Sequence, residues 1–146
     1  DEELDTSDEQ EPVFLSPADI GEQLGFCIGG HLAFRAALHA EVKATACLYP
    51  TGLQNGQLGR SVADSLQRVA EIQGALFTVF GTEDPHVPPE AHQQILQALS
   101  GLRHETHLYE ANHTFMRDDG WRWDPELADR AWAAALRFLR HELVEA

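Results

Sequence analysis

The chain has 146 residues, 43% of them hydrophobic, which is enough to build one globular domain around a buried core. Ten lysines and arginines oppose 24 aspartates and glutamates, and the net charge of −14 argues against nucleic acid or an anionic membrane as the main partner, since either needs a basic face. With two cysteines, no apolar run that could span a bilayer and no recognisable signal peptide, we expect a cytoplasmic protein with reduced thiols and without a disulfide framework.

The start of the chain is strongly acidic. Residues 1–12 contain seven acidic side chains and no basic one. Such a composition is typical of a solvated segment that cannot join a core. We therefore expect residues 1–12 to be an acidic flexible tail and residues 13–146 to form one domain.

Strand-like and helix-like patterns alternate through this domain. Short apolar runs bounded by turn residues predict strands at 44–49 and 75–80, and the segments 20–26 and 105–109 are also predicted to be strands. Periodicity and capping residues predict helices at 31–40, 61–72, 88–101 and from 124 to the end of the chain. The alternation predicts an α/β fold with a mostly parallel sheet of about four strands and helices on both faces.

Two of these helices carry start signals. Ser61 and Asp64 have the spacing of a capping box, and Asp124 precedes Pro125 at the first position of the last helix. The last helix also has an apolar stripe, made of Leu127, Ala131, Ala135, Leu139 and Leu143.

The stretch from Gly25 to Gly30 joins the first predicted strand to the first predicted helix. Its sequence, Gly-Phe-Cys-Ile-Gly-Gly, has the form G-x-[nucleophile]-x-G of a nucleophile elbow, with cysteine in place of the more common serine. An elbow lifts its nucleophile above the sheet, and the glycines give the backbone room to turn. Cys27 is therefore the candidate nucleophile, the backbone N–H of Ile28 is a candidate oxyanion donor, and the alternative for Cys27 is a small buried apolar residue.

The loops after two later strands carry an acid and a histidine. Asp84 follows the strand at 75–80, and His113 follows the strand at 105–109. In open α/β sheets, functional residues gather beyond the carboxyl ends of the strands. A cysteine needs an imidazole to take its proton, and a carboxylate fixes the tautomer of that imidazole, so Cys27, His113 and Asp84 suit nucleophilic catalysis. Glu83 is the competing acid, and each residue has an alternative as an ordinary loop residue.

With these motifs in place, the chain resembles the dienelactone hydrolase family of α/β-hydrolases from about residue 20 to residue 143. The matching pieces are the elbow around Cys27, the strand that ends at Tyr49, Gly81-x-x-Asp84 with Val87-Pro88, and Tyr109…His113-x-Phe115-x-Arg117. The resemblance implies that Cys27 is the nucleophile, His113 the general base and Asp84 its orienting acid. It also implies that Tyr49 and Arg117 contact substrate, and a guanidinium suits a substrate carboxylate.

The same resemblance implies that the chain is the C-terminal half of an α/β-hydrolase fold. Its first strand would be strand five of eight. The N-terminal half would supply a second oxyanion N–H, a glutamate that interacts with the cysteine, a further arginine and a cover for the edge of the first strand.

Other residues that could carry chemistry are expected to be structural. Cys47 lies in an apolar strand and is expected in the core, and His31 is expected to face solvent or the rim of the pocket. His104 and His107 are expected at the surface, in a loop and a strand and without matching acids. The tryptophans Trp121, Trp123 and Trp132 are expected to pack rather than to form a ligand cage. No motif predicts a metal site or a cofactor.

Three functions compete at this point. The first is a hydrolase of small esters or lactones, including carboxylate-bearing ones, that works through an acyl-thiol intermediate on Cys27. The second is a non-catalytic half-fold that pairs with a partner chain or another copy through an open sheet edge. The third, a thiol redox protein, ranks last because the chain has no C-x-x-C motif.

Overall fold

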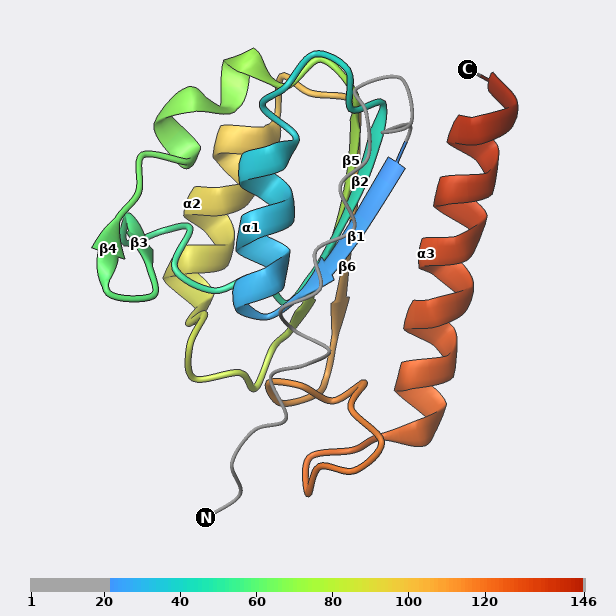
Figure 1. Ribbon diagram of the computed structural model, residues 1–146. Helices are drawn as coiled ribbons and strands as arrows, with labels where there is room; N and C mark the ends of the chain where they lie inside the picture. Colours follow the sequence, from blue (N-terminus) through green and yellow to red (C-terminus); the bar gives the residue numbers. More distant parts are fainter. Residues whose placement is uncertain (1–21, 146) are drawn as a thin grey trace, which may run out of the picture.

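The computed structural model describes residues 22–145, and the fold is drawn in Figure 1. The predicted acidic tail at 1–12, the start of the predicted domain and the first two residues of the strand expected at 20–26 lie outside the described residues.

A four-stranded parallel sheet forms the centre of the fold, as predicted. Its strands are β1 (Glu22–Phe26), β2 (Ala44–Leu48), β5 (Ala75–Gly81) and β6 (His104–Tyr109), in the order β1-β2-β5-β6. Every residue of β2 and β5 is buried, because both strands are central and covered on two faces. The residues of β1, at one edge, are all half-buried.

Helices cover the two faces of this sheet. Helix α1 (Ile28–Ala36) and helix α2 (Pro89–Leu99) lie on one face, and the long helix α3 (Pro125–Glu145) lies on the other (Figure 1). The side chains between α3 and the sheet form one apolar cluster, which includes Phe77 and Phe138, and those under α1 and α2 form another.

Helix α3 confirms the predicted start signal. The Leu127 N–H donates a hydrogen bond to Asp124 Oδ1 at 3.1 Å, which satisfies a donor in the first helical turn. Ala131, Ala135 and Leu139 of the predicted stripe are buried, whereas the side chain of Leu143 lies outside the described part. None of the described helices is both long enough and apolar enough to cross a membrane.

The helix predicted at 61–72 is wrong. Ser61 and Val62 form β4, which pairs antiparallel with β3 (Gln57–Leu58), and a 3₁₀ helix, η2, follows at Leu66–Glu71. The capping box fails because Asp64 instead accepts a hydrogen bond from Arg35 at 2.6 Å. Gly59, at φ 63°, supplies the tight turn between the two short strands.

Helix α1 also starts earlier than residues 31–40. It begins at Ile28 because the backbone N–H groups of Gly30 and His31 already donate to the Cys27 carbonyl, at 2.9 and 3.2 Å. The chain therefore passes from strand to helix within a single residue.

Candidate active site

Cys27 joins strand β1 to helix α1, and its backbone is strained. It has φ 59° and ψ −123°, a left-handed conformation that costs a non-glycine residue on the order of 1–3 kcal/mol. The surroundings fix it, since its N–H donates to the Leu48 carbonyl at 2.9 Å. Gly25 makes the turn possible, because a Cβ there would lie 2.1 Å from the Gly29 carbonyl oxygen. This is the geometry of the predicted elbow.

Asp84 and His113 are brought together by the pairing of two loops. The loop after β5 and the loop after β6 share backbone hydrogen bonds, from Thr82 N to Tyr109 O at 2.8 Å and from Glu83 N to Ala111 O at 3.0 Å. Close approach requires glycine at position 81, where a Cβ would lie 2.2 Å from the Ala111 carbonyl oxygen. Both functional side chains are buried at the sheet edge where Cys27 lies.

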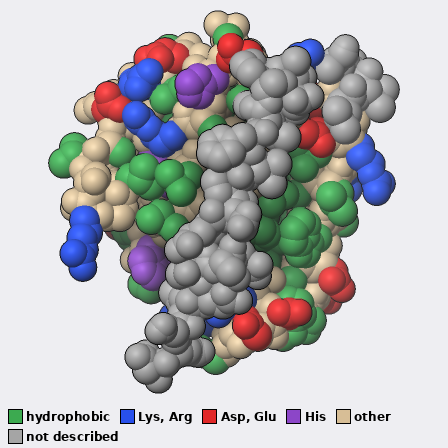
Figure 2. Space-filling view, in the orientation of Figure 1, with side chains coloured by type: hydrophobic (Ala, Val, Ile, Leu, Met, Phe, Trp, Pro, Cys, Tyr) green, Lys and Arg blue, Asp and Glu red, His purple; other side chains and the backbone are tan. Residues whose placement is uncertain are grey.

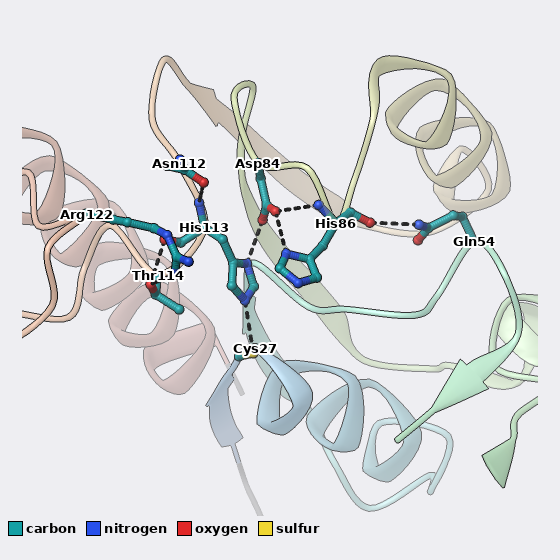
Figure 3. Close-up of polar contacts among 8 residues, drawn as sticks. All are labelled: Cys27, Gln54, Asp84, His86, Asn112, His113, Thr114 and Arg122. Carbon is teal, nitrogen blue, oxygen red and sulfur yellow. Dashed lines mark hydrogen bonds and ion pairs between the residues drawn. The ribbon is translucent and has the colours of Figure 1, made fainter. Parts of the chain in front are cut away.

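A continuous chain of hydrogen bonds links the three side chains (Figure 3). Cys27 Sγ lies 3.1 Å from His113 Nε2, and His113 Nδ1 lies 2.6 Å from Asp84 Oδ2. Because a carboxylate only accepts, His113 Nδ1 carries a proton and donates it to Asp84. The structure thus brings together the nucleophile, histidine and acid expected from the sequence.

The pKa values of the cysteine and histidine shift toward an ion pair. The hydrogen bond with His113 is the largest cause that lowers the pKa of the Cys27 thiol, and it outweighs the opposing effect of burial. Burial also works against a charged His113, but the hydrogen bonds with Asp84 and Cys27 prevail and raise the pKa of His113 to about 9. Both shifts favour a thiolate beside an imidazolium.

Asp84 has a second imidazole neighbour, His86. The His86 N–H donates to Asp84 Oδ1 at 2.8 Å, and the ring atom Nδ1 of His86 lies 3.1 Å from the same oxygen. Burial disfavours the carboxylate, yet the hydrogen bonds from His113 and His86 lower the pKa of Asp84. No sequence motif pointed to His86, although its position two residues after an aspartate is typical of a side chain-to-backbone turn.

A cavity of about 360 Å³ opens beside the sulfur of Cys27. It is lined by Phe26, Cys27, Tyr49, Thr114, Met116 and Arg117. Tyr49 and Arg117, the two expected substrate contacts, therefore lie on the same cavity as Cys27, and Phe26, Thr114 and Met116 line it without having been expected to contact substrate. Arg117 Nε donates to Asp119 at 2.7 Å on the exposed side.

Tyr49 forms a buried part of this wall. It adopts φ 39°, and its ring lies 5.3 Å from the His113 ring, measured between centroids. Burial raises the pKa of Tyr49 to about 12, so its hydroxyl stays protonated. The backbone N–H of Ile28 also interacts with the Cys27 thiol and contributes to its lowered pKa.

His31 does not face solvent or the pocket rim. It is fully buried, with Nδ1 at 2.7 Å from the Thr51 carbonyl oxygen and Nε2 at 2.6 Å from Ser65 Oγ. The position of His31 in the sequence did not reveal its burial, because its partner Ser65 lies in another segment, directly before η2.

The histidines of β6 also differ from expectation. His104 and His107 both lie in the strand, and His107 Nε2 donates to Glu105 at 2.6 Å, so an acid partner is present. Cys47 is buried in the apolar core as predicted, and burial raises the pKa of its thiol. Glu83, the competing acid, is exposed.

The tryptophans divide into two groups. Trp132 packs edge-on against Phe26, as expected, with ring centroids 5.5 Å apart. Trp121 is 82% exposed and Trp123 is 38% exposed, so the expectation of packing is wrong for these two. The Arg122 guanidinium lies over the Trp121 ring.

Comparison with known proteins gives related sequences and folds. A sequence model described as "Dienelactone hydrolase family" matches residues 16–143. A Saccharomyces cerevisiae protein named "Putative carboxymethylenebutenolidase" is 37% identical over 117 residues, which is 73% of this chain and 43% of the relative. A protein of the same name from Synechocystis sp. is 32% identical over 132 residues, which is 88% of this chain and 53% of the relative.

A solved structure has the same fold. The crystal structure named "Putative Dienelactone Hydrolase" from Klebsiella pneumoniae superposes with a TM-score of 0.74 at 24% identity, over 82% of this chain and 51% of that chain. The chain thus spans about half the length of the curated relatives that it matches. Since the family match runs from residue 16 to residue 143, the chain belongs to the dienelactone hydrolase family.

Proposed function

We propose that this chain carries the catalytic residues of a hydrolase that acts on ester or lactone bonds, with Cys27 as nucleophile. The observation that carries the proposal is the hydrogen-bonded chain from Cys27 Sγ through His113 to Asp84. The names of the related carboxymethylenebutenolidases and the family match support a lactone or ester as the substrate class.

The proposed reaction starts from the thiolate. Cys27 Sγ attacks the carbonyl carbon, and the negative charge that develops on the carbonyl oxygen is met by the Ile28 N–H. His113 then gives its Nε2 proton to the departing alkoxide, which leaves an acyl-thiol on Cys27. In the second half, His113 takes a proton from water, the hydroxide attacks the acyl-thiol, and the acid is released as the thiolate returns.

Asp84 and the cavity wall have supporting parts in this reaction. Asp84 keeps the Nδ1 proton of His113 in place, so that Nε2 faces the sulfur. Arg117 and Tyr49, on the cavity beside Cys27, are proposed to contact the substrate, and the guanidinium of Arg117 suits a substrate carboxylate.

The cellular compartment and the domain boundaries of this hydrolase are also proposals. Both cysteines are free, which suits the reducing cytoplasm, where a nucleophilic thiol stays available. The family match from residue 16 supports residues 13–146 as one domain after an acidic tail.

The test is acylation of the thiol by an activated ester such as p-nitrophenyl acetate. We expect a burst of nitrophenol and the mass of one acyl group on the peptide that contains Cys27. Cys27→Ala should lose both signals, whereas Cys47→Ala, which removes the buried thiol, should retain them. A Cys27→Ala variant that releases nitrophenol as fast as the parent chain would disprove the assignment.

The contribution of His113 can be tested without turnover. Because its hydrogen bond favours the thiolate, His113→Ala should slow alkylation of Cys27 by iodoacetamide at pH 7 by about tenfold or more. The matched control is His107→Ala, which removes an imidazole from β6, outside the cavity. Equal alkylation rates in the two variants would show that His113 does not activate the thiol.

A second function is favoured by the edge strand β1. In the described part of the chain, β1 pairs only with β2, and its outer edge offers backbone groups to another strand. We propose pairing through this edge, with a complementing segment or another copy, as the alternative to independent catalysis.

A further inference from the structure

The Asp84 carboxylate lies between two imidazole rings. Asp84, His86 and His113 each offer one ligand atom, and these atoms lie within 4.8 Å of one another, the one such group of three among the described residues. We propose that these three side chains form a binding site for a divalent transition-metal ion such as Zn²⁺, and that the bound ion inhibits the enzyme.

The spacing of the donor atoms suits a metal ion. Asp84 Oδ2 lies 2.6 Å from His113 Nδ1, and Asp84 Oδ1 lies 3.1 Å from His86 Nδ1. Zinc binds imidazole nitrogen and carboxylate oxygen at about 2.0–2.2 Å, so that neighbouring ligand atoms lie about 3.3 Å apart. Rotations of the two rings would bring the separations of the ligand atoms, which now lie between 2.6 Å and at most 4.8 Å, to this value.

The three ligands differ in mobility in a way that helps binding. Asp84 and His113 are buried and already oriented, and the His86 N–H fixes one carboxylate oxygen. The His86 side chain is 53% exposed, so its ring can rotate. It contacts both solvent and the Asp84 carboxylate. Its ring centroid lies 4.4 Å from that of His113, close enough for both rings to approach one ion (Figure 3).

The donor types select the class of ion. Two imidazoles and one carboxylate suit Zn²⁺, Cu²⁺ or Ni²⁺, whereas Mg²⁺ and Ca²⁺ prefer sites made of oxygen. The net charge of −14 also favours the approach of a cation. Cys27 lies beyond the opposite ring nitrogen of His113, at 3.1 Å from Nε2, and is therefore outside this set of ligands.

Binding would change the state of His113. The ion takes the lone pair of Nδ1, the Nδ1 proton is released to solvent, and coordination replaces the hydrogen bond to Asp84. The remaining ring proton then lies on Nε2, facing the sulfur, so His113 cannot take a proton from the attacking water. The inhibition rests on the proposed function, but the binding does not.

Calorimetric titration of the full chain with ZnCl₂, after removal of metals by a chelator, tests the site directly. We expect one ion per chain, binding at least about tenfold weaker in His86→Ala, and binding retained in Cys27→Ala. His107→Ala is the matched control, because His107 and Glu105 form a second close histidine–acid pair among the described residues and this variant should bind normally. Circular dichroism shows whether each variant is folded.

Several results would overturn the proposal. It fails if the parent chain binds no Zn²⁺, if His86→Ala binds as tightly as the parent, or if Cys27→Ala abolishes binding. Co²⁺ gives a second readout, since binding as proposed should give visible absorption without the near-ultraviolet thiolate-to-metal charge-transfer band. That band would place the ion on Cys27 instead.

Inhibition is measured separately, as the loss of ester turnover on adding Zn²⁺ and its recovery on adding chelator. Zinc that binds without slowing turnover would overturn the inhibitory part alone. If the chain has no turnover at all, the proposed function fails, while calorimetry still decides whether the metal site exists.

Discussion

Asp84 and Glu83 are adjacent acids with very different surroundings. Asp84 is buried and receives hydrogen bonds from the His113 ring and from the backbone and ring of His86. Glu83 is exposed, and its backbone N–H serves to join the two loops. The sequence left both acids open as partners of the histidine, and the geometry favours Asp84.

This difference predicts the effect of removing each charge. Asp84→Asn should lower kcat/KM for an activated ester by roughly 10²–10⁴-fold, because an amide can stabilise the wrong tautomer of His113. Glu83→Gln should change it by less than about twofold, since exposed side chains contribute little. Steady-state kinetics on both folded variants decides the question, and an equal loss in Glu83→Gln would reverse the assignment.

The predictability of single residues depended on whether the predicted topology brings their partners together, and not on their separation along the chain. Cys27, Asp84 and His113 were predictable because each follows a strand of a parallel sheet, and such strand ends meet at one edge. The burial of His31 was not, because its ring bonds to Ser65, which lies directly before η2 in the segment whose structure was wrongly predicted. His86 was missed because its role comes from a ring that reaches Asp84 only after the loop has folded.

At the scale of elements, the elbow depends on one glycine much more than on another nearby. A Cβ at Gly25 would lie 2.1 Å from the carbonyl oxygen of Gly29, a backbone atom that cannot move without breaking the turn. A Cβ at Gly29 would meet no atom within 4 Å. The turn therefore sterically requires glycine at position 25, whereas position 29 has room for a larger side chain.

Substituting alanine at each position should have opposite effects on stability. Gly25→Ala should lower the free energy of unfolding by about 1–3 kcal/mol or prevent folding, because the added methyl overpacks the turn. Gly29→Ala, inside helix α1, should raise it by up to about 1 kcal/mol, because alanine is the better helix former. Urea denaturation compares the two, and a stable Gly25→Ala with an intact burst would contradict the steric argument.

Most elements were predictable from periodicity, and the exceptions share a cause. The buried strands β2 and β5 and helix α3 have strong local patterns, and α3 starts at its predicted cap. Residues 57–72 were not predictable, because Asp64 bonds to Arg35 of helix α1 instead of capping a helix. The contact between Arg35 and Asp64, which the local sequence pattern does not reveal, replaced the capping interaction that this pattern predicted.

At the scale of the whole molecule, two large exposed apolar side chains lie on the helix that packs against the edge strand β1. On helix α1, which packs against β1, Ile28 is 46% exposed and Leu32 is 53% exposed. Figure 2 shows apolar side chains on the face over α1. This surface and the outer edge of β1 are where we propose that a complementing segment or a second copy packs.

We therefore expect the isolated chain to self-associate, with a sedimentation coefficient that rises with concentration. Leu32→Glu should weaken this association by at least about tenfold, because it places a charge on the apolar surface beside β1. Leu136→Glu is the matched control, as Leu136 is 43% exposed but lies on α3, across the sheet from α1.

A parent chain that remains monomeric at every concentration would argue against pairing between copies, whereas equal weakening by both variants would place the contact elsewhere. If Leu32→Glu becomes monomeric and keeps the acylation burst, pairing and catalysis are separate properties, since Cys27, His113 and Asp84 come from one chain.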